Sequence, residues 1–328
     1  MRFALRRLGF FLLTLWAALT LNFVLPRLMP GDPALAILGK LKAGASPQAL
    51  HVIEQQFGIG THQNVVAQYF GYLGNVATLK FGSSLTTQPG APVGRIILNA
   101  IPWTLGLVGV TTVLAFVLGT GIGIVAAWRR GTWLDGVMPP IFVIMTVIPF
   151  FWLGLILILI FGVKLRLLPY FFSYTYTLTP AFTPSFIGNV LEHAILPALA
   201  LLLTTIGTWI LTMRNTMITT LAEDYVRMAR AKGLPGRRIM LDYAARNAIL
   251  PNLTGFAMSL GFVLGGAILV EYVFNYQGVG WLLLQAVQNT DYPLMQALFL
   301  LITLGVLVAI LLSDLATAIL DPRTRAAR

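Results

Sequence analysis

The side chains in this sequence that could perform acid–base or metal chemistry are few and scattered. The three histidines, His51, His62 and His193, have no further ligand at the spacing of a metal site. Neither the nucleophile motif G-x-S-x-G nor the phosphate-binding motif G-x-x-x-x-G-K-[S/T] occurs. The chain contains no cysteine, which excludes disulfides and thiolate chemistry. The sequence therefore predicts no catalytic residues, no metal and no cofactor bound by this chain.

Charge is concentrated in residues 223–251, which read EDYVRMARAKGLPGRRIMLDYAARNAILP. They hold six Lys or Arg residues and three acids, in a chain that is only 10% charged. On a helix, Glu223 and Arg227 stand four residues apart with the acid first, which is the stabilising order, and Arg230 follows on the same face. Charge spacing of this kind predicts an exposed amphipathic helix.

Small residues distinguish this helix from a simple basic surface. Ala229, Ala231 and Gly233 remove side-chain bulk, so that another backbone could approach closely. The turn Leu234-Pro235-Gly236 then ends the helix, and a second helix leads to Pro251. A loop lying on anionic lipid would need positive charge but neither the small residues nor the acidic start. We therefore interpret the segment as a protein-docking helix, with a lipid-bound loop as the alternative.

The elements that must carry this helix are membrane-spanning. The chain is 57% hydrophobic, above the ~45–50% of soluble domains. A spanning helix needs roughly 20 apolar residues. Six charge-free runs approach or exceed this length and predict an all-α integral membrane protein with six transmembrane helices: Leu8–Pro26, Ile96–Trp128, Gly136–Val163, His193–Met213, Asn247–Val270 and Tyr292–Ser313. No small-residue cleavage site follows the first run, which we interpret as an uncleaved anchor.

The net charge of +11 is explained by topology. With the N-terminus inside, the short inner segments (residues 1–7, 129–130, 214–246 and 323–328) carry fifteen Lys or Arg residues. The short outer loops carry two, Lys164 and Arg166. This bias orients both termini and the charged stretch towards the cytoplasm. The basicity is therefore not a nucleic-acid footprint, and the lipid bilayer is the expected environment.

Carboxylates are absent from the middle of the apolar runs. Glu192 and Glu271 lie at outer edges of runs and Asp314 lies near an inner edge, as ordinary boundary residues do. A proton-coupled carrier would place acids near the midplane, and an intramembrane enzyme would need clustered acids or histidines. Both classes are disfavoured alternatives. The chain is thus expected to form a pathway whose energy comes from a partner.

Several motifs resemble one known family. The segment YVRMARAKG at 225–233, followed by RNAILP at 246–251, is similar to the cytoplasmic E-A-A-x-x-x-G motif of permease subunits of ABC importers. The leading Glu-Ala-Ala is absent, and the ending ARAKG is typical of the dipeptide/oligopeptide/nickel branch. PGDP at 30–33, FGSS at 81–84 and FNYQGVG at 274–280 occur in the order and spacing of that branch.

The resemblance implies a type I ABC-importer permease fold in a bacterial cytoplasmic (inner) membrane. It divides the chain into an N-terminal anchor at 1–30, an extracytoplasmic region at 31–95 and a permease core at 96–328 with a cytoplasmic coupling loop at 214–247. It implies that ATPase coupling uses Glu223, Asp224, Tyr225, Arg227, Ala229, Arg230, Ala231, Lys232, Gly233, Arg246, Asn247 and Pro251.

The implied partners are a second homologous permease, two ABC ATPase subunits that hold ATP and Mg, and an extracytoplasmic substrate-binding protein. The chain itself is expected to hydrolyse nothing. Small residues four apart, Gly261 and Gly265, predict a closely packed face that contacts either the second permease or another helix of this chain, and the resemblance favours the second permease. Peptides are the expected substrates; oligosaccharides, nickel and glutathione are the alternatives. The substrate-binding residues stay open.

Overall fold

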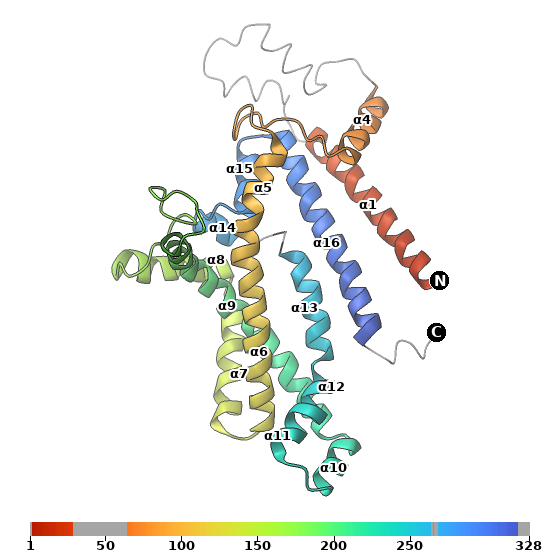
Figure 1. The fold of residues 1–328 in the computed structure, drawn as a ribbon, viewed down its shortest axis with the longest axis vertical. Helices are drawn as coiled ribbons and strands as arrows, with labels where there is room; N and C mark the ends of the chain where they lie inside the picture. The colour runs from red at the N-terminus through yellow and green to blue at the C-terminus, as the bar shows by residue number, and fades with distance from the viewer. Residues whose placement is uncertain (1, 29–63, 264, 266–267, 321–328) are drawn as a thin grey trace.

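The computed structural model describes residues 2–28, 64–263, 265 and 268–320 (Figure 1). Within this part of the chain the regular elements are helices, and an isolated antiparallel bridge joins Ser83 to Pro92. The elements are α1 (Arg2–Leu28), α4 (Val65–Ala77), α5 (Val93–Thr104), the π-helical turn η1 (Leu105–Gly109), α6 (Val110–Trp128), α7 (Trp133–Val147), α8 (Phe150–Leu157), η2 (Ile158–Lys164), α9 (Pro184–Leu221), α10 (Asp224–Ala231), α11 (Gly236–Arg238), η3 (Ile239–Ala245), α12 (Arg246–Ala248), α13 (Leu250–Phe262), α14 (Ile268–Val273), α15 (Val279–Gln288) and α16 (Tyr292–Leu320).

α1, α6, α7, α13 and α16 run roughly along the long axis of the molecule, with α4 and α15 at one end and α10 at the other (Figure 1). We refer to these as the α4 end and the α10 end. In the sequence, residues 63–76 suit a short amphipathic helix and the Ser/Thr/Gly-rich residues 82–90 suit a loop. α4 and the loop that follows it agree with both expectations. A further helix, predicted to begin at Ser46-Pro47, lies outside the described residues.

Three helices in the described residues are long and apolar enough to cross a membrane: Val93–Trp128, Pro184–Leu221 and Tyr292–Leu311. They contain or closely match the second, fourth and sixth expected spans. α9 begins as its sequence predicts, because Thr183 accepts a hydrogen bond from the Phe186 N–H and Pro184 occupies the first turn, where no N–H partner is needed.

The third expected span, Gly136–Val163, is not one straight helix. Asp135–Val147 and Phe150–Lys164 meet at an angle of 98°. Pro149 lacks an N–H and disfavours the helical conformation of the residue before it, and Ile148 is accordingly extended, with ψ 124°. The expectation of a single helix is therefore wrong at this position, and the two parts count as one bent span or as a re-entrant pair.

α1 covers the first expected span, Leu8–Pro26, whereas the helices of the fifth expected span are shorter than predicted in the described residues. α1 contains the apolar stretch Gly9–Val24. The fifth run is divided between α13 and α14, with a break between Phe262 and Ile268. The total of six spans stays a prediction.

The small-residue pair in the fifth run packs inside this chain. A Cβ at Gly261 would lie only 1.9 Å from the Cβ of Ala309, so α13 and α16 meet there at backbone distance. Gly265 faces Ile302, which also belongs to α16. The expectation that Gly261 and Gly265 contact a second permease is therefore wrong, because α16 already covers them.

Glu271 is fully buried rather than an ordinary boundary residue. The Thr104 hydroxyl donates to its Oε1 at 2.7 Å, and the backbone N–H groups of Gly280 and Trp281 donate to its Oε2 at 2.8 and 3.0 Å. The Val279 N–H in turn donates to the Thr104 hydroxyl at 2.7 Å. The free N–H groups in the first turn of α15 are thus satisfied by α5 and α14, which fixes three elements together at the α4 end.

Candidate functional site

The helix α10 forms where the sequence predicts a docking helix, at one extreme of the molecule (Figure 1). Glu223 is its N-cap residue, Asp224 lies in its first turn and Arg230 in its last, an order that complements the helix dipole. Arg227 pairs with Asp224 at 3.6 Å rather than with Glu223. Both side chains of this pair are largely exposed, so the pair contributes little to the stability of the chain.

The inner face of α10 is apolar and packs on its own chain. Val226 and Ala229 are buried together with Ile239, and Trp128 and Leu221 pack against this group. The small size of Ala229 therefore lets α10 approach the following helix. The interpretation that Ala229 leaves room for a partner is wrong, since its side chain is only 3% exposed.

The end of α10 is fixed by a Schellman motif. Lys232 is the C-cap residue, the Gly233 N–H donates to the Arg230 carbonyl at 2.9 Å, and the Leu234 N–H donates to the Ala229 carbonyl at 3.3 Å. Gly233 has φ +73°, a left-handed conformation, and a Cβ there would meet no atom within 4 Å. Conformation therefore explains Gly233 within this chain, with no need for a steric limit.

Substitution of Gly233 distinguishes a requirement for its left-handed conformation from a requirement for its small size. We expect Gly233→Asn to perturb α10 less than Gly233→Ala, because Asn enters the left-handed region more readily. Alanine in this left-handed conformation costs about 1 kcal/mol. This cost should make amide exchange in the last turn of α10 about fivefold faster. Hydrogen–deuterium exchange of residues 224–231 measures this order. If Gly233→Ala perturbed α10 less than Gly233→Asn, side-chain size and not the backbone conformation would explain the glycine at this position.

The outer face of α10 is exposed and mixed in character. Around Met228, which is 60% exposed, lie the exposed residues Glu223, Asp224, Tyr225, Arg227, Arg230, Ala231, Lys232 and Gly233. Met228 was not among the predicted site residues. Its sequence signal is a large apolar side chain, next to charged ones, on the side of the helix opposite the buried pair. This surface can bind a partner through one apolar anchor surrounded by charge.

The second helix of the loop supports α10 from the side. The Asn247 side-chain N–H donates to the Tyr225 hydroxyl at 3.0 Å and to the Tyr243 carbonyl at 3.1 Å. Arg246, Asn247 and Pro251 are all exposed. The structure thus joins Asn247 to Tyr225 across 22 residues, and it exposes every predicted coupling residue except Ala229.

Other chemical groups do not converge near α10. Among the described residues, no group of three or more His, Asp or Glu side chains could hold a metal ion. The Nδ1 of His193 lies 2.8 Å from the Asn189 carbonyl one turn earlier on α9. His51 and His62 lie outside the described residues. In the described part of the chain, charged residues and an exposed apolar side chain gather on the outer face of α10.

Comparison with known families identifies the class of this protein. Residues 119–326 match the family of binding-protein-dependent transport system inner membrane components, and residues 1–108 match the N-terminal family of these membrane components. The chain belongs to this family of ABC-importer permeases. It is a multi-pass inner-membrane permease component and not a catalytic protein.

Individual relatives are similar over nearly their whole length. The di/tripeptide transport system permease protein DppB of Pseudomonas aeruginosa is 34% identical over 98% of both chains. The probable peptide ABC transporter permease protein y4tP of Sinorhizobium fredii is 34% identical over 92% of both chains. The glutathione transport system permease protein GsiC of Escherichia coli K12 is 33% identical over 99% of both chains.

Proposed function

We propose that this chain forms half of the translocation pathway of an ATP-driven importer of short peptides. Support comes from the names of the relatives, since di/tripeptides, peptides and the tripeptide glutathione are one chemical class. The observation that carries the coupling role is the exposed face of α10 around Met228, on a helix fixed firmly to its own chain.

The proposed assembly contains a second, different permease, two ATPase subunits and an extracytoplasmic substrate-binding protein. ATP and Mg bind on the ATPases, and this chain binds no cofactor. The ATPases contact the α10 face, with Arg246, Asn247 and Pro251 at its edge. Because α10 follows α9 after two residues, a displacement of α10 moves the end of the 38-residue helix α9 directly.

The proposed orientation places α10 and both termini in the cytoplasm and residues 31–95 outside, with the loop 214–247 as the coupling loop of the core 96–328. The basic residues Arg129 and Arg130 belong to the turn between α6 and α7 at the α10 end (Figure 1). Positive charge at that end supports a cytoplasmic location for it.

Single cysteines test this orientation in a chain that has none. Gln88 is exposed near the α4 end and Lys232 is exposed at the α10 end. We expect a membrane-impermeant maleimide to label Gln88→Cys in intact cells and Lys232→Cys only after the membrane is opened. The reverse pattern would invert the proposed topology.

Substrate class is tested by competition in membrane vesicles that hold the complete transporter. We expect unlabelled di- and tripeptides to inhibit uptake of a labelled dipeptide, with glutathione as a weaker or equal competitor. Oligosaccharides and nickel salts should not compete. Uptake of an oligosaccharide or of nickel, with no uptake of any peptide, would refute the peptide assignment and leave the permease class intact.

A further inference from the structure

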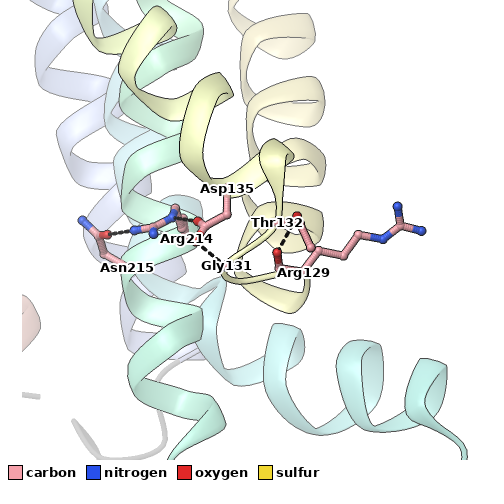
Figure 2. Close-up of polar contacts among 6 residues, drawn as sticks. All are labelled: Arg129, Gly131, Thr132, Asp135, Arg214 and Asn215. Atoms are coloured by element: carbon pink, nitrogen blue, oxygen red, sulfur yellow. Dashed lines mark hydrogen bonds and ion pairs between the residues drawn. The ribbon is translucent and has the colours of Figure 1, made fainter.

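An ion pair joins two segments that are 79 residues apart near the α10 end (Figure 2). The Arg214 Nε lies 2.5 Å from the Asp135 Oδ1, and the side chains are 23% and 9% exposed. Arg214 belongs to α9, and Asp135 to the first turn of α7, just after the turn that connects α6 to α7. The pair therefore fastens that turn to the helix that leads into α10.

The carboxylate is held in place by its own turn. The Gly131 N–H donates to the other oxygen of Asp135 at 3.0 Å, and the Thr132 hydroxyl donates to the Arg129 carbonyl at 2.7 Å (Figure 2). The position of Asp135 at the start of α7 also suits the positive end of the helix dipole. Asp135 is thus preorganised, and Arg214 binds to a carboxylate whose place is already fixed.

The helices around this pair are packed closely. A Cβ at Gly123 of α6 would lie 2.7 Å from the Ile210 carbonyl oxygen and 3.2 Å from the backbone nitrogen of Arg214. α7 also packs along α9. From Arg214, α9 continues for seven residues, or about 10 Å at a rise of ~1.5 Å per residue, to its end at Leu221, and α10 begins at Asp224. The pair lies where α6, α7 and α9 meet, close to α10.

The other ion pairs in the described part of the loop are of a different kind. Arg227–Asp224 and Arg238–Asp242 have nitrogen–oxygen distances of 3.6 and 3.8 Å, and all four side chains are more than half exposed. Such exposed pairs contribute little, whereas removing one partner from a mostly buried pair leaves an unpaired charge. Arg238–Asp242 therefore provides a matched control within the same cytoplasmic region.

We propose that Asp135 and Arg214 are positioning residues for energy coupling. Their ion pair makes the α6–α7 turn move together with α9, so that a displacement of α10 reaches α7 as well. The bend at Ile148–Pro149 then separates α7, which follows the ATPases, from α8, which does not. This proposal rests on the proposed function, because it assumes that ATPase subunits displace α10.

The test uses the complete reconstituted transporter and measures substrate molecules imported per ATP hydrolysed. We expect Asp135→Asn and Arg214→Gln each to lower this ratio by about fivefold, within the usual range of coupling between sites, with ATP hydrolysis retained. Arg214→Lys, which keeps the charge, should fall between wild type and Arg214→Gln. Asp242→Asn should leave the ratio unchanged.

Assembly of the complex is measured in parallel, by the amount of ATPase that co-purifies with each variant. An unchanged ratio in both neutralised variants would overturn the proposal. So would a loss of uptake that only follows a loss of assembled complex, since the pair would then be purely structural. If the wild-type transporter itself shows no ATP-driven uptake, the proposed function fails instead, which separates the two claims.

Discussion

Replacing Arg227 by glutamate should weaken binding of the ATPase subunits at least about tenfold and reduce ATP-driven uptake accordingly. Reversing a charge at a docking surface replaces attraction by repulsion, which costs about 1.4 kcal/mol or more. In the described part of the chain, the Arg227 side chain forms an ion pair with Asp224, and both side chains are largely exposed. The substitution should therefore leave the permease folded in the membrane. Co-purification of ATPase with the variant measures the effect.

Arg237→Glu is the matched control for this experiment. Arg237 is also exposed and belongs to the same loop, but it lies beyond the turn that ends α10. The two substitutions change the net charge equally, so that any general electrostatic effect is the same. We expect Arg237→Glu to keep most of the ATPase binding. Equal losses in both variants would assign the effect to the charge of the loop and would contradict a docking face on α10.

The second large effect concerns the second permease. α6 carries exposed apolar side chains at one-turn spacing, namely Val110, Val113, Leu114, Val117 and Leu118. These residues form a stripe along one face of the helix, and no other element of the described chain covers it. The paired glycines at 261 and 265 cannot serve as the interface, because α16 covers them. In a membrane, lipid or the second permease of the proposed assembly covers such a stripe.

Reconstitution with and without the second permease tests this requirement. We expect this chain, combined only with the ATPases and the binding protein, to give no uptake above background. Addition of the second permease should restore uptake. Robust ATP-dependent uptake from the mixture that lacks the second permease would show that one permease sequence suffices.

The fold was predictable where long apolar runs decide it. The second, fourth and sixth runs have no charge, and each lies on a helix that contains it or closely matches it. The 98° bend at Pro149 was not predictable, although the proline was visible. A proline in an apolar run can kink a helix slightly or break it, and tertiary packing chooses between these outcomes. The end of α13 at Phe262 does have a sequence signal, because the Gly265-Gly266 pair that follows is typical of a turn.

The candidate site was predictable in place but not in every detail. Charge spacing predicted the helix α10. The burial of Ala229, however, depends on Ile239 and Trp128, which lie elsewhere in the sequence. The role of Gly233 follows from its positive φ, which a turn signal suggests but does not prove. Pairing of Arg214 with Asp135 depends on how α7 packs on α9. Local sequence patterns can therefore predict exposed helix faces and helix ends. Pairs of residues far apart in the sequence can be identified only from the three-dimensional structure.

The energy source of transport tests the central claim most directly. The complete transporter is reconstituted in proteoliposomes, and uptake of a labelled dipeptide is measured under two conditions. In one, ATP and Mg are supplied on the side that exposes the ATPases; in the other, a proton gradient is imposed without ATP. The account predicts uptake with ATP that stops with a non-hydrolysable analogue, and no uptake with the gradient alone. Uptake driven by the proton gradient in the absence of ATP would contradict it.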